Sequence, residues 1–303
     1  MSHKDTKTQS QKYFSLCTLC LCGNPLTYLD KTLQIKSITY QSSTISYSVV
    51  GKGKTVVLLH GFGEDGEIWN EQINYLKEYF RLIIPDLPGS GRSEMIPDMS
   101  IEGISEVVKE ILNIELQKFS AAAEAEGVIG HSMGGYITLA FAEKYPALLK
   151  AFGLVHSTAF ADSEEKKLAR AKSIEFIRNN GAYEFLKTSI PGLFKKPSDP
   201  YVNALIEKGK NFTPEALIQY YEAMIVRPDR TDMLKNFNGP VLFIIGEHDT
   251  AVPFQQSLQQ CYLPGESQVH ILRNSAHMGM QEEPGKMGEI VMRFLNDDNS
   301  AFI

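Results

Sequence analysis

The chain has 303 residues, of which 43% are hydrophobic and 22% are charged, and this composition excludes a disordered polymer. The 30 Lys and Arg against 36 Asp and Glu give a formal net charge of −6 without a long run of one sign, so no nucleic-acid partner is expected. No stretch reaches the roughly 18 to 20 consecutive apolar residues that a membrane-spanning helix needs, so no transmembrane segment is predicted.

The first 30 residues have no clear hydrophobic periodicity and differ in composition from the rest of the chain. Lys4, Lys7 and Lys12 precede a short apolar patch over residues 13–22, a layout similar to that of a weak secretory signal. Polar residues interrupt the patch, and no small-x-small cleavage site follows it cleanly. We therefore predict a flexible tail over residues 1–30 and a cytoplasmic protein, with export or lipid attachment as the alternative.

Three of the four cysteines, Cys17, Cys20 and Cys22, lie in this tail, and Cys261 lies far from them. That distribution is not typical of a disulfide-stabilised scaffold. A zinc site at Cys17 and Cys20 would need a second pair of Cys or His ligands at similar spacing, and the sequence has none. No metal is therefore expected, and the role of the three tail cysteines stays open.

From about residue 33 the chain alternates short β-branched or apolar runs with segments of helical periodicity. In chain order we expect a hairpin of strands over 35–40 and 44–50, a strand over 55–59, a helix over 68–80, a strand over 82–85, a helix over 101–119, a strand ending at Ile129, a helix over 136–144, strands over 151–155, 241–245 and 268–272, and a helix over 285–295. Strands separated by helix-length segments predict an α/β fold with a mostly parallel central sheet and helices on both faces.

The long stretch between the strands at 151–155 and 241–245 contains no strand candidate and is predicted to form several helices. Ser163 is placed to cap a first helix, which Gly181 ends, and Thr213 with the following proline opens another. The proline-containing segment between them is expected to be a loop. The apolar face of the first helix is expected to carry Leu168, Ala171, Ile174 and Ile177.

This helical stretch is inserted into the pattern of a parallel sheet. In such sheets ligands bind outside the carboxyl ends of the strands, and an insertion at this point lies over those ends. We therefore predict a core of residues 31–156 and 237–303, covered by a helical lid, or cap, of residues 157–236.

Gly130-His131-Ser132-Met133-Gly134 matches the Gly-x-Ser-x-Gly pattern, with a predicted strand before it and a predicted helix after it. In that context the serine lies on a sharp turn with a strained backbone and an exposed hydroxyl, and the flanking glycines relieve the crowding. Ser132 is therefore the predicted nucleophile.

A serine hydroxyl needs a histidine to accept its proton and a carboxylate to orient that histidine. Of the seven histidines, His277 is the one that follows the last predicted strand, in a loop at the carboxyl edge of the sheet. Asp249 follows the preceding strand at the equivalent edge, and Glu247 is the rival acid. We predict a triad of Ser132, His277 and Asp249.

Several motifs occur in a fixed order along the chain. They are His60-Gly61-Phe62-Gly63 with Trp69, the segment from Asp86 to Ser93, the nucleophile motif, Gly246-Glu247-His248-Asp249 with Val252-Pro253, and Ala276-His277. In these motifs the sequence resembles the α/β-hydrolase family, in its lidded, esterase-like serine hydrolase branch, from about Val49 to the C-terminus. It departs from the pattern over residues 121–127, where Ala and Glu occupy a stretch expected to be an apolar strand, which puts the length of that strand in doubt.

The resemblance implies an oxyanion hole formed by the backbone N–H groups of Phe62 and Met133. It also implies acyl transfer to water through an acyl-enzyme, with no cofactor and with a small-molecule substrate. We therefore expect a hydrolase that acts on carboxylic ester bonds. The substrate, its acyl length and the oligomeric state do not follow from the sequence.

Two other functions stay open at this point. A carbon–carbon hydrolase or elimination lyase of the same fold uses the same three residues, and its anionic substrate tends to need basic groups such as Arg227 and Arg230. A hydrolase-fold receptor with little turnover is the other. The candidates for an acyl pocket, or for packing the lid on the sheet, are Phe185, Leu186, Phe194, Tyr220 and Met224.

Overall fold

The computed structural model describes residues 33–117 and 125–296. The predicted tail over residues 1–30, with Cys17, Cys20 and Cys22, therefore lies outside the described residues. A search of the described helices finds none with the length and apolar character needed to cross a membrane.

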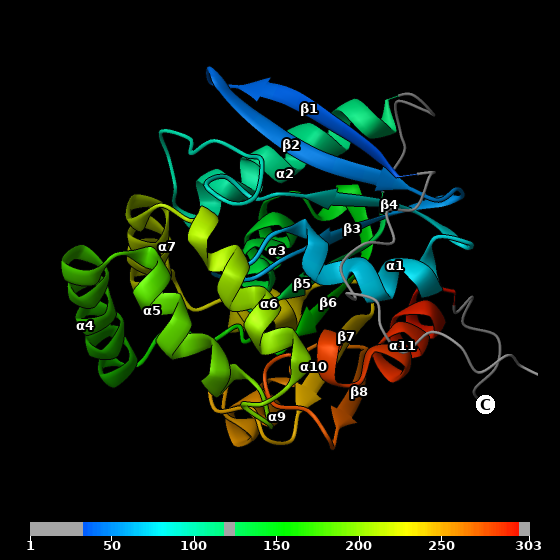
Figure 1. Cartoon of the computed structure of the whole chain (residues 1–303). Helices are drawn as coiled ribbons and strands as arrows, with labels where there is room; N and C mark the ends of the chain where they lie inside the picture. Colours follow the sequence, from blue (N-terminus) through cyan, green and yellow to red (C-terminus); the bar gives the residue numbers. More distant parts are fainter. Residues whose placement is uncertain (1–32, 118–124, 297–303) are drawn as a thin grey trace, which may run out of the picture. The chain divides into compact units, whose positions relative to one another are not determined.

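The core of the described chain is one sheet of eight strands in the order β1-β2-β4-β3-β5-β6-β7-β8 (Figure 1). The strands are β1 Gln34–Tyr40, β2 Ser43–Val50, β3 Lys54–Leu59, β4 Phe80–Pro85, β5 Ala125–His131, β6 Leu149–Val155, β7 Val241–Gly246 and β8 Ser267–Leu272. Strands β3 to β8 pair in parallel, whereas β2 pairs antiparallel with β1 and with β4. The predicted hairpin and mostly parallel sheet are confirmed.

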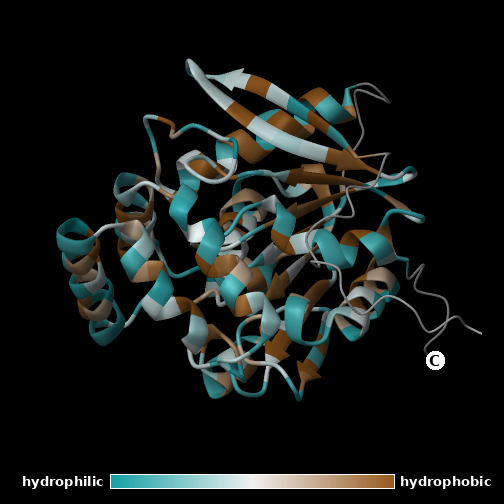
Figure 2. Cartoon of the chain, viewed as in Figure 1, coloured by the Kyte–Doolittle hydropathy of each residue, from teal (hydrophilic) through white to brown (hydrophobic). Residues whose placement is uncertain are grey.

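The central strands are mostly apolar, as expected for strands covered on both faces, and the one charged residue of β4, Arg81, pairs with the buried Glu115. Every residue of β4 and β7 is buried, whereas the edge strand β8 is partly exposed. Figure 2 shows the same contrast, with hydrophobic strands at the centre of the sheet and a predominantly hydrophilic helix α4, Glu164–Asn180, away from it. The carboxyl ends of the parallel strands meet at one edge, and the candidate site is built there.

Helices cover both faces of the sheet, as predicted. They are α1 Asn70–Leu76, α2 Ile101–Leu116, α3 Met133–Lys144, α9 Phe254–Gln260, α10 Gly279–Glu282 and α11 Pro284–Asn296. Helix α1 packs on α11, and α2 packs on α3 (Figure 1). The helix predicted over 68–80 is wrong at its end: α1 stops at Leu76, and Phe80 already pairs with Lys54 of β3, because strand pairing overrides the helical spacing of Leu76 and Phe80.

The segment between β6 and β7 is helical. It contains α4, α5 Ala182–Ser189, α6 Pro200–Lys208, α7 Pro214–Val226 and α8 Thr231–Asn236, and α4 lies beside α5 and α7 (Figure 1). The side chain of Ser163 accepts a hydrogen bond from the N–H of Lys166, and Thr213 caps α7 in the same way. Gly181, with φ 89°, ends α4 as predicted.

Two details of this segment differ from the prediction. The stretch expected to be a loop contains a 3-10 turn over Ile190–Leu193 and the start of α6, where Asp199 caps a helix that has proline at its first position. The apolar face of α4 is narrower than expected, because Leu168 is 63% exposed while Ile174 and Ile177 are buried. A helix that packs on one side against two neighbours buries few of its residues.

Candidate active site

Ser132 occupies the sharp turn between β5 and α3. Its backbone has φ 50° and ψ −114°, a conformation that side-chain-bearing residues rarely adopt. A Cβ at Gly130 would lie 2.3 Å from the carbonyl oxygen of Gly134, and one at Gly134 would lie 2.4 Å from that of Leu59. Both flanking glycines are therefore required, because the backbone approaches too closely for a side chain. Strand β5 begins at Ala125 and reaches the turn, although Ala and Glu precede the motif where an apolar strand was expected.

The structure brings the three predicted triad residues into one hydrogen-bonded chain. The Ser132 hydroxyl lies 2.9 Å from Nε2 of His277, and Nδ1 of His277 lies 2.8 Å from Oδ2 of Asp249. His277 and Asp249 are buried, whereas Ser132 keeps some exposure. Glu247, the rival acid, is exposed and takes no part in this chain.

Asp249 is held as a carboxylate at the end of β7. Its Oδ1 accepts hydrogen bonds from the N–H groups of Ala251 and Val252, at 2.8 and 2.9 Å. Burial alone would raise the pKa of Asp249, but His277 and His156 outweigh burial and hold that pKa well below its usual range. A charged carboxylate is the state that orients His277 Nδ1–H and stabilises an imidazolium.

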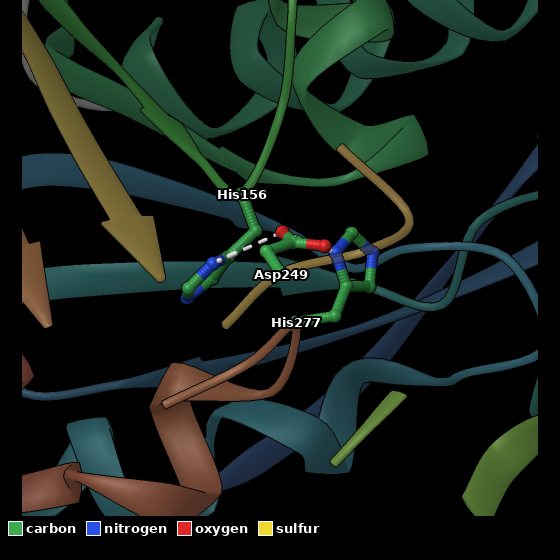
Figure 3. Close-up of side chains that lie close together, drawn as sticks. All are labelled: His156, Asp249 and His277. Atoms are coloured by element: carbon green, nitrogen blue, oxygen red, sulfur yellow. Dashed lines mark hydrogen bonds and ion pairs between the residues drawn. The ribbon is translucent and has the colours of Figure 1, made fainter. Parts of the chain in front are cut away.

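A second histidine, His156, contacts the same carboxylate. Figure 3 shows Asp249 between His156 and His277, and Nδ1 of His156 lies 3.5 Å from Asp249 Oδ2. Nδ1 also lies 3.2 Å from the N–H of Gly246, and Nε2 accepts from the N–H of Gly279 at 3.2 Å. His156 thus joins the end of β7 to the loop that follows His277, and burial lowers its pKa to about 4, so the ring is neutral at physiological pH.

These groups also have the chemistry of metal ligands. The candidate ligand atoms of His156, Asp249 and His277 lie within 4.8 Å of one another. Nδ1 of His277 donates to Asp249, and both nitrogens of His156 face backbone N–H groups, so a cation there would displace the hydrogen bonds that align the triad. The geometry favours proton transfer, and we assign no metal to these residues.

A buried pair behind the triad was not found from the sequence. Oε2 of Glu64 lies 2.9 Å from Nδ1 of His131 and accepts from the N–H of Gly61 at 2.7 Å. Burial raises the pKa of Glu64, but His131 and the Gly61 N–H outweigh it and hold that pKa below its usual range. Only the position of Glu64, just after the glycine-rich motif, hinted at this role.

The two residues implied to form an oxyanion hole, Phe62 and Met133, lie in the loop after β3 and directly after Ser132. Met133 is the first residue of α3, so its N–H has no acceptor within the helix. Phe62 lies in the loop after β3, and a Cβ at the neighbouring Gly61 would be 3.2 Å from the Cβ of Ser132. The Phe62 loop therefore passes directly beside the serine, where a tetrahedral intermediate would form.

The other residues singled out in the sequence have structural partners. Nδ1–H of His60 donates to the Gly61 carbonyl, while its Nε2 accepts from the N–H of Leu87, which ties two loops together. Arg230 pairs with two glutamates and is thereby neutralised. The five lid side chains considered for an acyl pocket, Phe185, Leu186, Phe194, Tyr220 and Met224, are all buried.

Comparison with known proteins relates most of the described region to hydrolases. The alpha/beta hydrolase family model matches residues 56–289. Lipase 1 of Psychrobacter immobilis is 29% identical over 262 residues, which cover 82% of this chain and 80% of that protein. A thermophilic esterase from Thermogutta terrifontis, solved with malate bound, is 27% identical with a TM-score of 0.79, over 86% of this chain and 98% of the esterase.

A meta-cleavage product hydrolase from Pseudomonas fluorescens IP01 also superposes, with a TM-score of 0.73 over 86% of this chain and 97% of that one. Its sequence is 20% identical, a level at which the likeness concerns the fold alone. Activity must therefore be argued from the site.

Proposed function

The chain belongs to the alpha/beta hydrolase family, and from this membership we propose that it is a serine hydrolase that cleaves a carboxylic ester of a small substrate through an acyl-enzyme intermediate. The observation that carries the proposal is the unbroken chain from the Ser132 hydroxyl through His277 to Asp249, with contacts of 2.9 and 2.8 Å. The relatives described as lipase and esterase support ester cleavage at this site.

In the proposed reaction, His277 Nε2 takes the hydroxyl proton of Ser132 as the oxygen attacks the ester carbonyl. The imidazolium that forms is stabilised by the Asp249 carboxylate at Nδ1. Collapse of the tetrahedral intermediate expels the alcohol, which receives the proton from Nε2. A water molecule activated by His277 then attacks the acyl-serine by the same sequence of steps and releases the acid.

The negative oxygen of each tetrahedral intermediate is proposed to accept hydrogen bonds from the N–H groups of Phe62 and Met133. Each such donor contributes roughly 10²- to 10³-fold to turnover. Helices α4 to α8 are proposed to act as the cap, residues 157–236, over the core. The backbone supports this role, because the N–H of His277 donates to the carbonyl of Leu193 in that segment at 2.9 Å.

A fluorophosphonate probe, which reacts with activated serines, tests the proposal. We expect it to label Ser132, and we expect Ser132→Ala to lose both the label and hydrolysis of p-nitrophenyl butyrate. Ser189→Ala is the control, because the hydroxyl of Ser189 contacts only the carbonyl of Leu186 in its own helix. Labelling that persists in Ser132→Ala, or loss of labelling in the control, contradicts the proposal.

The two alternatives predict other kinetics with the same protein. A receptor with little turnover would show one burst of product followed by a near-zero rate. A carbon–carbon hydrolase would cleave anionic keto acids faster than short esters. Steady turnover of the short ester, without a dominant burst, supports the esterase.

A further inference from the structure

Two arginines pair with one carboxylate in the segment that follows β6, and Lys166 acts with them on the nearby Tyr136. Nε of Arg170 donates to Oδ2 of Asp162 at 2.6 Å, and Nη1 of Arg227 lies 2.8 Å from Oδ1 of the same residue. Lys166 donates to the carbonyl of Ala251 at 2.9 Å and forms no ion pair with any described residue. The cluster therefore carries more positive charge than Asp162 neutralises.

The two arginines differ in how many of their donors are used. Arg227 donates from Nη1 and Nη2 to the carbonyls of Met224 and Phe160, and its guanidinium lies 3.9 Å from the ring centre of Tyr136. Nη1 and Nη2 of Arg170 have no acceptor within the described part of the chain, although its side chain is only 12% exposed. Neither nitrogen is fully shielded from solvent, so an anion can reach these free donors and supply the acceptors that the described residues do not.

Two aromatic contacts locate Arg170 relative to the triad. Its guanidinium carbon lies 5.4 Å from the ring centre of Tyr221, and Tyr221 stacks on Phe62 with ring centres 4.3 Å apart. Tyr136 lies on α3, four residues after Ser132, and its ring packs against the guanidinium of Arg227, which shares Asp162 with Arg170. Arg170 is therefore bracketed by groups that adjoin the oxyanion loop and the nucleophile.

The pKa of the Tyr136 phenol reflects the electrostatic potential around these cations. Burial raises the pKa of this phenol, but Arg227, Lys166 and Arg170 together outweigh burial and leave the pKa below its ordinary value. The Tyr136 hydroxyl makes no hydrogen bond to any residue that the structure describes. A hydroxyl without a hydrogen-bond partner among the described residues and a guanidinium with free donors thus share a region of positive potential.

We propose that the substrate of the Ser132 site is an ester that carries a carboxylate, which binds the terminal nitrogens of Arg170 and the hydroxyl of Tyr136. This inference rests on the proposed function and adds the substrate class to it. A planar guanidinium and a carboxylate match in geometry and form two parallel hydrogen bonds. The ring of Tyr221 and the carboxylate of Asp162 hold Arg170 in place for this contact.

The test compares substrates with and without a free carboxylate. The first series is the mono-p-nitrophenyl esters of succinic, glutaric and adipic acid, and in the second series the free carboxylate of each is converted to a methyl ester. We expect kcat/KM to favour the best acid over its methyl ester by about 10-fold or more. Arg170→Gln should lower kcat/KM for the acid by about 10- to 100-fold and for the methyl ester by less than about 3-fold. Tyr136→Phe should shift the same ratio in the same direction.

Arg178→Gln is the matched control, because Arg178 lies on the same helix, is 60% exposed and pairs only with the exposed Glu222. Arg170→Lys keeps the charge and loses the two-point contact, so its ratio should lie between those of the wild type and Arg170→Gln. Equal losses on acid and methyl ester in Arg170→Gln would mean that Arg170 has a structural role only, and would overturn the inference. A wild type without preference for the acid would overturn it too.

A binding measurement separates this inference from the proposed function. Calorimetry with adipate, glutarate and succinate uses Ser132→Ala, in which no chemistry takes place. We expect one of these dianions to bind, and we expect the double variant Ser132→Ala/Arg170→Gln to bind it at least about 10-fold more weakly. If the dianion binds but the wild type hydrolyses no ester, the proposed esterase activity is refuted and the anion site stands. If the wild type hydrolyses the methyl esters but no dianion binds, the anion site is refuted and the esterase activity stands.

Discussion

Nε2–H of His131 donates to the backbone carbonyl of His277 at 3.0 Å, so the residue that precedes Ser132 holds the loop of His277. Its Nδ1 faces the Glu64 carboxylate, which also accepts from Gly61 in the oxyanion loop. The His131 ring therefore lies between a carboxylate and a carbonyl, which both accept hydrogen bonds. One buried pair thus links three loops of the site.

Breaking this pair is expected to reduce stability and turnover together. Glu64→Gln removes the carboxylate that contacts the buried His131 ring and accepts from the N–H of Gly61, and breaking a buried pair of this kind costs about 3 to 5 kcal/mol. His131→Asn removes the donor to His277, so we expect a lower kcat with little change in KM. In urea unfolding, the double variant Glu64→Gln/His131→Asn should lose less unfolding free energy than the two single variants lose together, by about 0.5 to 3 kcal/mol. Additive effects would show that the two groups act independently.

Glu67→Gln is the control for Glu64→Gln. Glu67 lies three residues away, its side chain is 44% exposed, and it pairs at the surface with Lys208. Surface pairs of this kind contribute about 0 to 1 kcal/mol. We expect wild-type kcat and a small change in unfolding free energy for this variant.

The predicted triad could be found because each member follows a strand that ends at the same edge of a parallel sheet. That rule needs only the strand pattern and the motif around Ser132. Glu64 and His156 were missed because their roles depend on which buried polar groups meet, and periodicity carries no such information. Helix ends were missed for a related reason, since the burial of Phe80 is decided by pairing of β4 with β3 and not by local spacing.

Asp249→Asn is expected to lower kcat by about 10⁴-fold while the fold is kept. The N–H groups of Ala251 and Val252 bind Oδ1, so the amide oxygen of the variant takes that position and its NH₂ faces Nδ1 of His277. His277 then accepts at Nδ1 and carries its proton on Nε2, where it cannot receive the proton of Ser132. Steady-state hydrolysis of p-nitrophenyl butyrate measures the loss, and fluorophosphonate labelling should slow in parallel.

Glu247→Gln provides the comparison for Asp249→Asn, because Glu247 is exposed and lies two residues earlier on the same loop. We expect its kcat to stay within about 2-fold of the wild type, as is usual for surface substitutions. The reverse result, a large loss in Glu247→Gln and a small one in Asp249→Asn, would reassign the acid.

His156 is expected to make the protein sensitive to acid. Its pKa falls from 6.5 to about 4 on folding, so the unfolded chain takes up a proton at a higher pH than the folded one. Stability is therefore lost as the pH falls between these two values, by about 2 kcal/mol between about pH 7 and pH 5 from this residue. Protonation would also place a positive charge beside the rings of His277 and His131, which pack near it.

The free energy of unfolding of His156→Gln should depend less on pH than that of the wild type between about pH 7 and pH 5, as measured by urea unfolding at both pH values. His248→Gln is the matched control, since His248 is exposed beside Asp249. If the wild type and His156→Gln lose the same free energy on acidification, the ring is not held neutral by its burial.

Gly61→Ala tests the position of the oxyanion loop. A Cβ at residue 61 would lie 2.9 Å from Nδ1 of His131, 3.0 Å from Oε2 of Glu64 and 3.2 Å from Cβ of Ser132. The loop must move away from all three, and the N–H of Phe62 moves with it, so we expect kcat to fall by about 10²- to 10³-fold, as for loss of one oxyanion donor. Gly192→Ala is the control, because a Cβ there meets nothing within 4 Å. A Gly61→Ala enzyme with wild-type kcat and an unchanged melting temperature would show that Phe62 does not donate to the intermediate.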